Sequence, residues 1–420
     1  MNRTLLLWVA ILLSPALRLD ATNYEENKVG TYQLPNPLVC KDGTPVTRTN
    51  QWFDKRRPEI LELYHKEIFG FTPHPGIHTQ FNVWENSANA LEGKAVRKQI
   101  EVNLTGSPRG PVVHLLLYTP AEKTSPVPTF LCLQFQGNYT VIDDPGIAIF
   151  PAWDRKKFTL AMPKLPHRGE LSNNWNIPAT LARGYGFAVV NYQEIEPDMA
   201  QGLGFQYGAH QNPAFDQTNK GSSCGAIGAW AWGTSRLLDY LETDKDVDAK
   251  KVILFGHSRL GKTALWAGAE DTRFAAVIAS CSGEMGAALS RRDFGETVDD
   301  VLKHFPYWMC GNFSKYRGRW NELPIDSHCL LALIAPRPLF LSTGSEDLWG
   351  DPHGEFLAAK AATPVYELVG KTGISETEFP PLDHVLKHDL SFNCHAGKHD
   401  VFPSDWDAFL DFADAHFSQK

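Results

Sequence analysis

The stretch Lys251-Val-Ile-Leu-Phe-Gly-His-Ser-Arg-Leu-Gly-Lys262 decides the fold of this chain. It begins with an apolar run, Val252 to Phe255, which suits a short strand buried on both faces of a parallel sheet. The chain then turns sharply through Gly256, His257 and Ser258. The residues that follow, 263–269, predict a helix that packs back onto the strand. The stretch therefore predicts a strand, a tight turn and a helix, with a serine at the turn.

This arrangement is the nucleophile elbow of α/β-hydrolases. A serine at such a turn projects its hydroxyl above the sheet. The backbone N–H groups that follow, at the helix N-terminus, can then face a developing oxyanion. The usual pattern is G-x-S-x-G, whereas here Leu260 occupies the last glycine position and Gly261 follows one residue later.

The composition is that of an ordinary globular protein and allows one large α/β domain or two smaller ones. Hydrophobic residues make up 43% of the 420 residues and charged residues 21%, enough to bury a sizeable core. The net charge is −8 and there is no basic run. We therefore expect no nucleic-acid partner and no binding to an acidic membrane surface.

The N-terminus has the form of a secretory signal. Arg3 precedes an apolar run from Leu5 to Leu13, which is too short to span a bilayer but suits a signal-peptide core. We predict that residues 1–21 are a signal peptide and that residues 22–420 form a single domain. An exported protein, periplasmic or secreted, follows from this prediction, and no later segment reads as a membrane span.

The chain has seven cysteines, all of them beyond the predicted signal peptide. An exported protein can form disulfides, and we expect one or two bridges with the remaining thiols buried. There is no C-x-x-C pair, so a zinc cluster is not expected.

Strands and helices alternate along the chain, which predicts a mostly parallel sheet covered on both faces, a three-layer αβα sandwich. Residues 97–104 and 111–119 are expected to pair antiparallel. Two long segments, 143–176 and 194–224, lack periodicity and are interpreted as insertions over the face of the sheet; 370–400 is interpreted as loop. The remaining expected strands are 128–135, 186–192, 252–255, 274–280, 338–342 and 364–369, and the expected helices are 52–69, 177–183, 226–242, 354–362 and 405–416.

A serine nucleophile needs a base and an acid, which in this fold follow it in the order acid, then histidine. Glu346 and Asp347 both follow the expected strand 338–342. Among the downstream histidines (His384, His388, His395 and His399), His399 lies just before the closing helix, where the base is expected. His395 and His399 could also ligate a metal, but Gly397 lies between them and no third ligand is evident, so no metal is predicted.

At this point the sequence resembles a known family. Gly256-His-Ser-Arg-Leu-Gly-Lys262 is similar to the G-C/H-S-R-x-G-K signature of glucuronoyl esterases, carbohydrate esterase family 15. The resemblance covers about residues 50–415 and is closest to the bacterial branch, which carries insertions around the site. Further similar stretches are 135–138, 183–186, 282–292, Trp349 and 397–399.

The resemblance implies hydrolysis of esters of glucuronic acid or its 4-O-methyl form, including those that join xylan to lignin in plant cell walls. It implies Ser258 as nucleophile, His399 as base and Arg259 as a cationic donor to the oxyanion. We expect an enzyme without a cofactor, acting as a monomer. The resemblance also implies residues that contact the sugar, with hydroxyl groups bound by Lys262 and Glu296 and the ring covered by Trp349.

The acid is where the sequence departs from the fungal members, which place a glutamate at the position of Cys281. A thiol cannot hold an imidazolium as a carboxylate does, so we assign the acid to the later loop, as the resemblance to many bacterial members implies. Asp347 is preferred because its spacing before Trp349 is similar to the pattern of those members, with Glu346 and then Glu284 as alternatives. Two other functions stay open: another carbohydrate esterase, such as an acetyl-xylan esterase, and a noncatalytic carbohydrate-binding protein.

Overall fold

The computed structural model describes residues 22–73, 77–108, 110–154, 157–164, 167–215, 218–219 and 221–418. The signal-peptide prediction for residues 1–21 lies outside these ranges. Within them, no helix combines the length and the apolar character needed to cross a bilayer.

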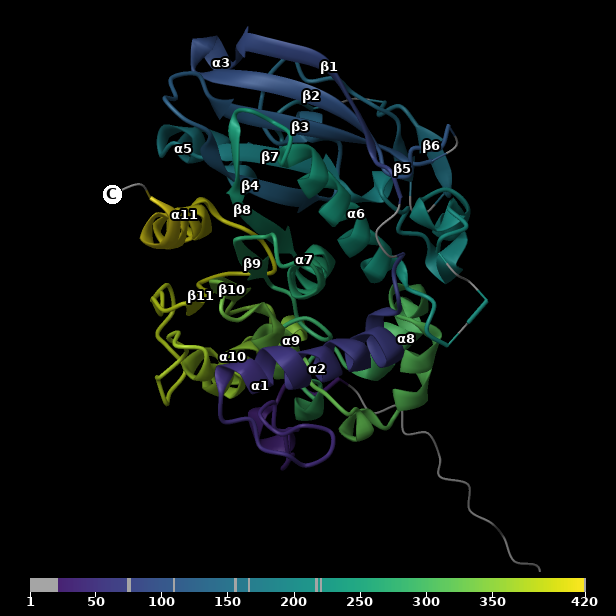
Figure 1. Cartoon of the computed structure of the whole chain (residues 1–420), viewed down its shortest axis with the longest axis vertical. Helices are drawn as coiled ribbons and strands as arrows, with labels where there is room; N and C mark the ends of the chain where they lie inside the picture. Colours follow the sequence, from purple (N-terminus) through teal and green to yellow (C-terminus); the bar gives the residue numbers. More distant parts are fainter. Residues whose placement is uncertain are drawn as a thin grey trace, which may run out of the picture.

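In the described part of the chain, nine strands form one sheet in the order β1-β2-β3-β7-β4-β8-β9-β10-β11 (Figure 1). The strands from β7 to β11 in this order run parallel, and β1, β2 and β3 add an antiparallel edge. The bounds are β1 Gln80–Asn89, β2 Ala95–Asn103, β3 Val112–Pro120, β4 Val127–Gln134, β7 Gly186–Asn191, β8 Val247–His257, β9 Ala276–Ser280, β10 Leu339–Gly344 and β11 Leu390–His395. The predicted antiparallel pairing of 97–104 with 111–119 is confirmed by β2 and β3.

Each face of the sheet is covered by helices. Side chains alternate along a strand, so Leu254 of β8 joins one hydrophobic core while Ile253 and Phe255 join the other. The first core is closed by α2 Arg57–Tyr64, α6 Ala226–Leu241, α7 Arg259–Glu270, α9 Ser327–Ile334 and α10 Pro352–Leu368. The second is closed by α5 Ile177–Ala182 and α11 Pro403–Phe417. This is the predicted three-layer α/β-hydrolase fold.

The prediction of a late strand at 364–369 is wrong, because those residues end α10. Val365 and Tyr366 follow Ala362 at helical spacing and are fully buried with it, so packing on the sheet stabilises the helix past its internal Pro364. The last strand is instead β11, inside the segment 370–400 that was expected to be loop. This correction matters because the end of β11 carries the loop of His399.

Other elements differ mainly at their ends. α7 begins at Arg259, directly after the serine, rather than at Thr263. The strand β1 was not expected, since most of its residues are exposed and form no apolar run. The predicted helix 52–69 is one helical rod with two π-type turns, composed of α1 Thr49–Gln51, η2 Trp52–Arg56, α2 and η3 His65–Phe69.

The two insertions contain short elements. The first holds the hairpin β5 Ala152–Asp154 and β6 Thr159–Ala161, followed by α4 Ser172–Trp175; the second holds η6 Ala200–Gln206 and η7 Ala209–Gln211. The remaining short helices are η1 Glu26–Lys28, α3 Ala90–Gly93, η4 Asn138–Thr140, η5 Tyr192–Glu194, η8 Ser290–Arg292, α8 Val298–His304, η9 Pro306–Trp308, η10 Gly311–Tyr316, η11 Trp320–Glu322 and η12 Leu348–Gly350.

The expectation of one or two disulfides is also wrong. All seven cysteines, which lie within the described residues, are free and buried. Cys132 of β4 and Cys394 of β11 are fully buried within their strands. These two thiols behave as small apolar side chains.

Candidate active site

Ser258 stands at the turn between β8 and α7 with φ 61° and ψ −130°. A positive φ is costly for a residue with a Cβ, and such strain is typical of functional turns. Its N–H donates to the carbonyl of Ser280 at 2.8 Å, which ties the turn to β9. The side chain makes no capping bond to α7, so the hydroxyl is not used to hold the helix.

The last glycine of the elbow stands at position 261 rather than 260 for a steric reason. A Cβ at Gly256 would lie 2.0 Å from the carbonyl oxygen of Leu260, and one at Gly261 would lie 3.0 Å from the Cβ of Ser282. Position 261, not 260, is therefore where α7 passes closest to the end of β9. Because α7 begins at Arg259, the N–H groups of Arg259 and Leu260 come before its first intrahelical bonds, which Gly261 and Lys262 donate to the carbonyl of Ser258 at 2.8 and 3.2 Å. These two N–H groups can therefore face a ligand.

Asp347 and His399 meet at the ends of neighbouring strands β10 and β11. Nδ1 of His399 and Oδ2 of Asp347 are 2.6 Å apart; the carboxylate is buried, while the imidazole side chain is 42% exposed. Two backbone bonds fasten the loops together, from Ser345 N to His395 O at 3.0 Å and from Glu346 N to Gly397 O at 2.7 Å.

The ring of His399 also lies beside the elbow. Its centroid is 4.7 Å from that of His257, the residue before the serine. Burial lowers the pKa of His257 well below its ordinary value, and the neighbouring His399 acts in the same direction. His257 is therefore a neutral ring of the elbow that packs beside the base.

The two alternative acids, Glu346 and Glu284, lie in different surroundings from Asp347. Glu346 is exposed. Glu284 is buried and accepts from the Ser290 hydroxyl at 2.6 Å, and burial raises its pKa well above the ordinary value. Of the three candidates, Asp347 is the one bonded to His399.

Another histidine considered as base, His395, is used elsewhere. Its Nδ1 lies 3.0 Å from Oδ1 of Asp405 and its Nε2 lies 3.1 Å from the carbonyl oxygen of Lys398. Both ring nitrogens thus have protein partners, so a metal held by His395 and His399 finds no support.

Arg259 points into an aromatic enclosure. Its guanidinium carbon lies 4.8 Å from the ring centroid of Trp308 and 5.6 Å from that of Phe135. Nη1 donates to Oδ2 of Asp198 at 2.6 Å. Burial alone would lower the pKa of Arg259, but the charge of Asp198 raises it above the ordinary value.

The sequence did not single out Asp198. Besides Arg259, its carboxylate accepts from the hydroxyls of Tyr192 and Tyr307 at 2.6 and 2.5 Å and from Nε1 of Trp308 at 3.0 Å. It is one acid in the aperiodic segment 194–224, with donors from three other parts of the chain. No local pattern could have indicated this role.

The three residues expected to contact the sugar lie together. Nζ of Lys262 donates to the carbonyl of Ser282 at 2.7 Å and lies 3.4 Å from Oε2 of Glu296; both side chains are buried. The N–H of Glu296 donates to the carbonyl of Trp349 at 2.8 Å. Trp349 itself is 37% exposed, so its ring is available at the surface beside the Lys262–Glu296 pair.

A second residue that the sequence did not single out is Glu355 of α10. Its Oε1 accepts from the N–H of Gly283 at 2.7 Å and from the hydroxyl of Ser282 at 3.2 Å. Burial raises the pKa of Glu355 to about 8, and the charge of Asp347 contributes in the same direction. This carboxyl holds the turn whose Ser282 carbonyl orients Lys262.

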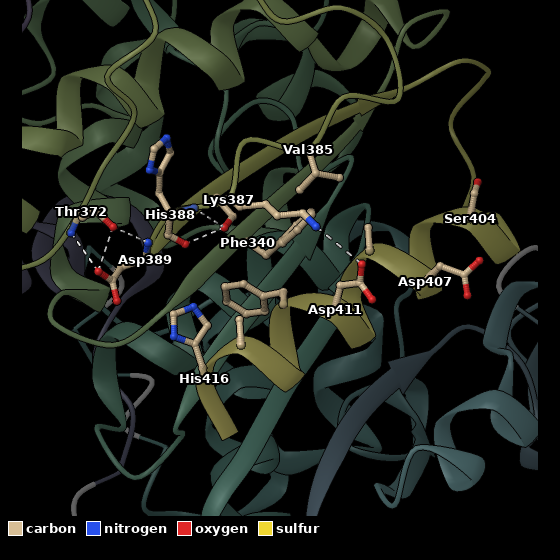
Figure 2. Close-up of a pocket in the computed structure, with 14 residues that line it drawn as sticks. Phe340, Thr372, Val385, Lys387, His388, Asp389, Ser404, Asp407, Asp411 and His416 are labelled. Atoms are coloured by element: carbon tan, nitrogen blue, oxygen red, sulfur yellow. Dashed lines mark hydrogen bonds and ion pairs between the residues drawn. The ribbon is translucent and has the colours of Figure 1, made fainter. Parts of the chain in front are cut away.

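A well-formed surface cavity lies elsewhere, between α11 and the starts of β10 and β11 (Figure 2). It has a volume of about 420 Å³ and contains none of the predicted site residues. Lys387 faces Asp411 across it, with Nζ 3.7 Å from Oδ2. Since the elbow and its partners follow the opposite, carboxyl ends of the strands, this cavity is not the candidate active site.

A buried acid, an imidazole and a strained serine at the carboxyl ends of a parallel sheet define a serine hydrolase of the α/β-hydrolase class. A family model described as glucuronyl esterase of fungi matches residues 174–370. Among curated proteins, the chain is 43% identical to carbohydrate esterase MZ0003 of an unknown prokaryote, over 94% of this chain and 92% of that protein. It is 34% identical to 4-O-methyl-glucuronoyl methylesterase 1 of Wolfiporia cocos, over 80% of this chain and 72% of the relative.

Solved structures agree. A glucuronoyl esterase from Solibacter usitatus superposes with a TM-score of 0.89 at 44% identity, covering 93% of this chain and all of that one. A CE15 glucuronoyl esterase from Teredinibacter turnerae gives 0.74 at 32% identity, covering 92% of this chain and 89% of that one. The chain belongs to carbohydrate esterase family 15, the glucuronoyl esterases.

Proposed function

We propose that this protein hydrolyses esters of glucuronic acid or 4-O-methylglucuronic acid, such as those that link xylan side chains to lignin alcohols in plant cell walls. The observation that carries the proposal is the 2.6 Å contact between Asp347 and His399 next to the strained elbow. Relatives named 4-O-methyl-glucuronoyl methylesterase support the substrate class.

In this proposal Ser258 attacks the uronate carbonyl, and His399 accepts the hydroxyl proton as the new C–O bond forms. Asp347 holds the Nδ1–H of His399 and stabilises the imidazolium. The proton then passes to the alcohol oxygen as the ester bond breaks. A water molecule, activated by the same imidazole, releases the glucuronate and restores the serine.

Arg259 and the first N–H groups of α7 are the proposed donors to the oxyanion. A cationic donor gains most where negative charge develops, so its contribution falls mainly on turnover. The bond to Asp198 fixes the guanidinium in advance, which avoids reorganisation during the reaction.

Lys262, Glu296 and Trp349 are the proposed contacts to the sugar. The ammonium and the carboxylate, 3.4 Å apart, offer a donor and an acceptor to neighbouring hydroxyl groups. The exposed indole face is suited to stacking on a pyranose ring. An acetyl esterase would have no use for this constellation.

We also propose that residues 1–21 are removed on export, so that residues 22–420 act as one domain on extracellular or periplasmic substrate, as a monomer and without a cofactor. The export proposal rests on the form of the N-terminus, with its short apolar run after Arg3.

The test uses purified protein with benzyl glucuronate, methyl glucuronate and an acetylated xylo-oligosaccharide. We expect hydrolysis of both glucuronate esters and little release of acetate. A preference for the acetyl ester would replace the proposed function with an acetyl-xylan esterase. Failure of a serine-reactive phosphonate to label Ser258 would instead favour a noncatalytic carbohydrate-binding protein.

A further inference from the structure

Cys281 is a buried thiol that lies against the acid and the base. The ligand atoms of Cys281, Asp347 and His399 (one thiol sulfur, one carboxylate oxygen and one ring nitrogen) all lie within 4.8 Å of one another. The three residues come from the ends of β9, β10 and β11, neighbouring strands that fix their spacing. Cys281 has a φ of 46°, so the backbone after β9 turns at this residue.

A sulfur, an imidazole nitrogen and a carboxylate oxygen are the ligand types that zinc prefers. Zinc bonds of about 2.0–2.3 Å place tetrahedral ligand atoms roughly 3.5 Å apart. Since the three ligand atoms lie within 4.8 Å of one another, adjustments of at most about 1.3 Å bring them to this spacing. The imidazole is the exposed member, with 42% of its side chain accessible, and provides both an entry path and the freedom to move.

We propose that Cys281, Asp347 and His399 form a binding site for a thiophilic divalent cation such as Zn²⁺, and that its occupation reversibly inhibits the enzyme. On binding, the thiol proton of Cys281 leaves to solvent as the sulfur–metal bond forms. The carboxylate of Asp347 and a ring nitrogen of His399 donate lone pairs, and water completes the tetrahedron.

Inhibition follows because the metal takes the two groups that the proposed mechanism needs. Once Asp347 and His399 are ligands, their 2.6 Å hydrogen bond is lost and the imidazole is held by the metal. The inhibition therefore rests on the proposed esterase function, whereas metal binding itself depends on the three ligands alone. The two parts can be tested separately.

The binding test uses the full chain with Ser258→Ala, which keeps all three ligands and removes turnover. Titration with Co²⁺ is expected to give a thiolate-to-cobalt charge-transfer band in the near ultraviolet that saturates at one equivalent and is displaced by Zn²⁺. Adding Cys281→Ser should remove the band. Adding Cys394→Ser, which removes a buried free thiol from β11, two strands away from β9, should leave it. His399→Ala, a change at an exposed residue, provides a second ligand variant and should weaken Co²⁺ binding at least about tenfold.

The activity test measures Zn²⁺ inhibition of the wild-type chain and of Cys281→Ser, each relative to its own metal-free rate. We expect inhibition that EDTA reverses, with at least about tenfold more Zn²⁺ needed for Cys281→Ser. Equal inhibition of both proteins, or a cobalt spectrum that lacks the thiolate band, overturns the inference. A chain that binds cobalt through Cys281 but hydrolyses no ester would retain the metal site and overturn the proposed function.

Discussion

Asp198 and Asp347 are two buried carboxylates near the elbow, and the protein holds them in opposite ways. Asp198 is buried and accepts hydrogen bonds from the buried Tyr192, Tyr307 and Trp308 and from the partly exposed Arg259. Asp347 bonds to His399, whose ring is 42% exposed and carried by a loop. Asp198 is thus enclosed by several donors, while the partner of Asp347 is open to solvent.

This difference matches the roles proposed for Arg259, which Asp198 holds, and for His399, which Asp347 holds. An oxyanion donor works best when it is preorganised, because any reorganisation adds to the barrier. A general base has to reach both the serine and the leaving alcohol, which favours an imidazole that is open to the substrate. The insertion 194–224 therefore supports the rigid side, formed by Asp198 and Arg259, and the ends of β10 and β11 support the exposed side, formed by Asp347 and His399.

The largest expected effect comes from removing the groups that react. Ser258→Ala and His399→Ala should each lower kcat for benzyl glucuronate by at least about 10⁴-fold, since loss of a triad member leaves only binding and oxyanion stabilisation. His384→Ala, an exposed histidine of the same C-terminal segment, is the matched control and should retain activity. Equal losses at His384 and His399 would mean that His399 has no special role.

The acid assignment gives the next effect. Asp347→Asn keeps the shape but cannot stabilise the imidazolium, so kcat should fall by roughly 10²–10⁴-fold. Glu346→Gln, one residue earlier and exposed, should stay within about twofold. Steady-state kinetics on both variants decides the matter, because the reverse ranking would transfer the role of acid to Glu346.

These residues could be found from the sequence because their signals are local. The elbow places a predicted strand, turn and helix within residues 252–269. Asp347 follows a predicted strand, and its spacing before Trp349 matches the pattern of the bacterial family members. The departure at Cys281 also helped, since a thiol in place of a carboxylate required another acid. The contact between Asp347 and His399 is the geometry that this reasoning requires.

Asp198, Glu355 and β11 could not be found in this way. Asp198 and Glu355 act through hydrogen bonds to residues 61 and 72 positions away, and nothing near them in sequence indicates those partners. The strand β11 was missed because the late strand was assigned to residues 364–369, whose composition is strand-like. Packing instead makes those residues the end of a helix. Contacts between residues far apart in the sequence determine the roles of Asp198 and Glu355 and the position of the last strand.

Asp198→Asn tests the rigid side directly. The variant keeps one oxygen acceptor but loses the charge that holds Arg259, so we expect kcat to fall by about tenfold with KM changed by less than about threefold. Tyr307→Phe removes one of the other donors to Asp198 and leaves the bond to Arg259; its kcat should change by less than about threefold. A rise in KM without a change in kcat would mean that Arg259 binds substrate rather than the transition state.

The smallest effect on activity is expected at Glu355, and it is revealed by pH. Because the folded protein holds this carboxyl protonated up to a pKa of about 8, while the unfolded chain ionises it near pH 4.5, the unfolded state gains stability from Glu355 as pH rises between these values. Folding stability should thus decline by on the order of 1 kcal/mol per pH unit in this window. Glu355→Gln cannot ionise, so its melting temperature should decline less steeply from pH 5 to 8, with kcat at pH 6 within about threefold of the wild type.

Glu270 is the matched control, since burial raises its pKa to about 8 as well, but it contacts Thr72 and lies away from the elbow. Glu270→Gln should flatten the stability profile to a similar degree and leave the pH dependence of kcat unchanged. Ionisation of Glu355 places a second negative charge near Asp347, the acid that holds His399, while the bonds that Glu355 accepts from Gly283 and Ser282 become stronger. Suppose that kcat/KM of the wild type falls above pH 8, and that the fall persists in Glu270→Gln but disappears in Glu355→Gln. This result would assign the pH sensitivity to the charge of Glu355 beside Asp347. The same fall in all three proteins would locate its cause elsewhere.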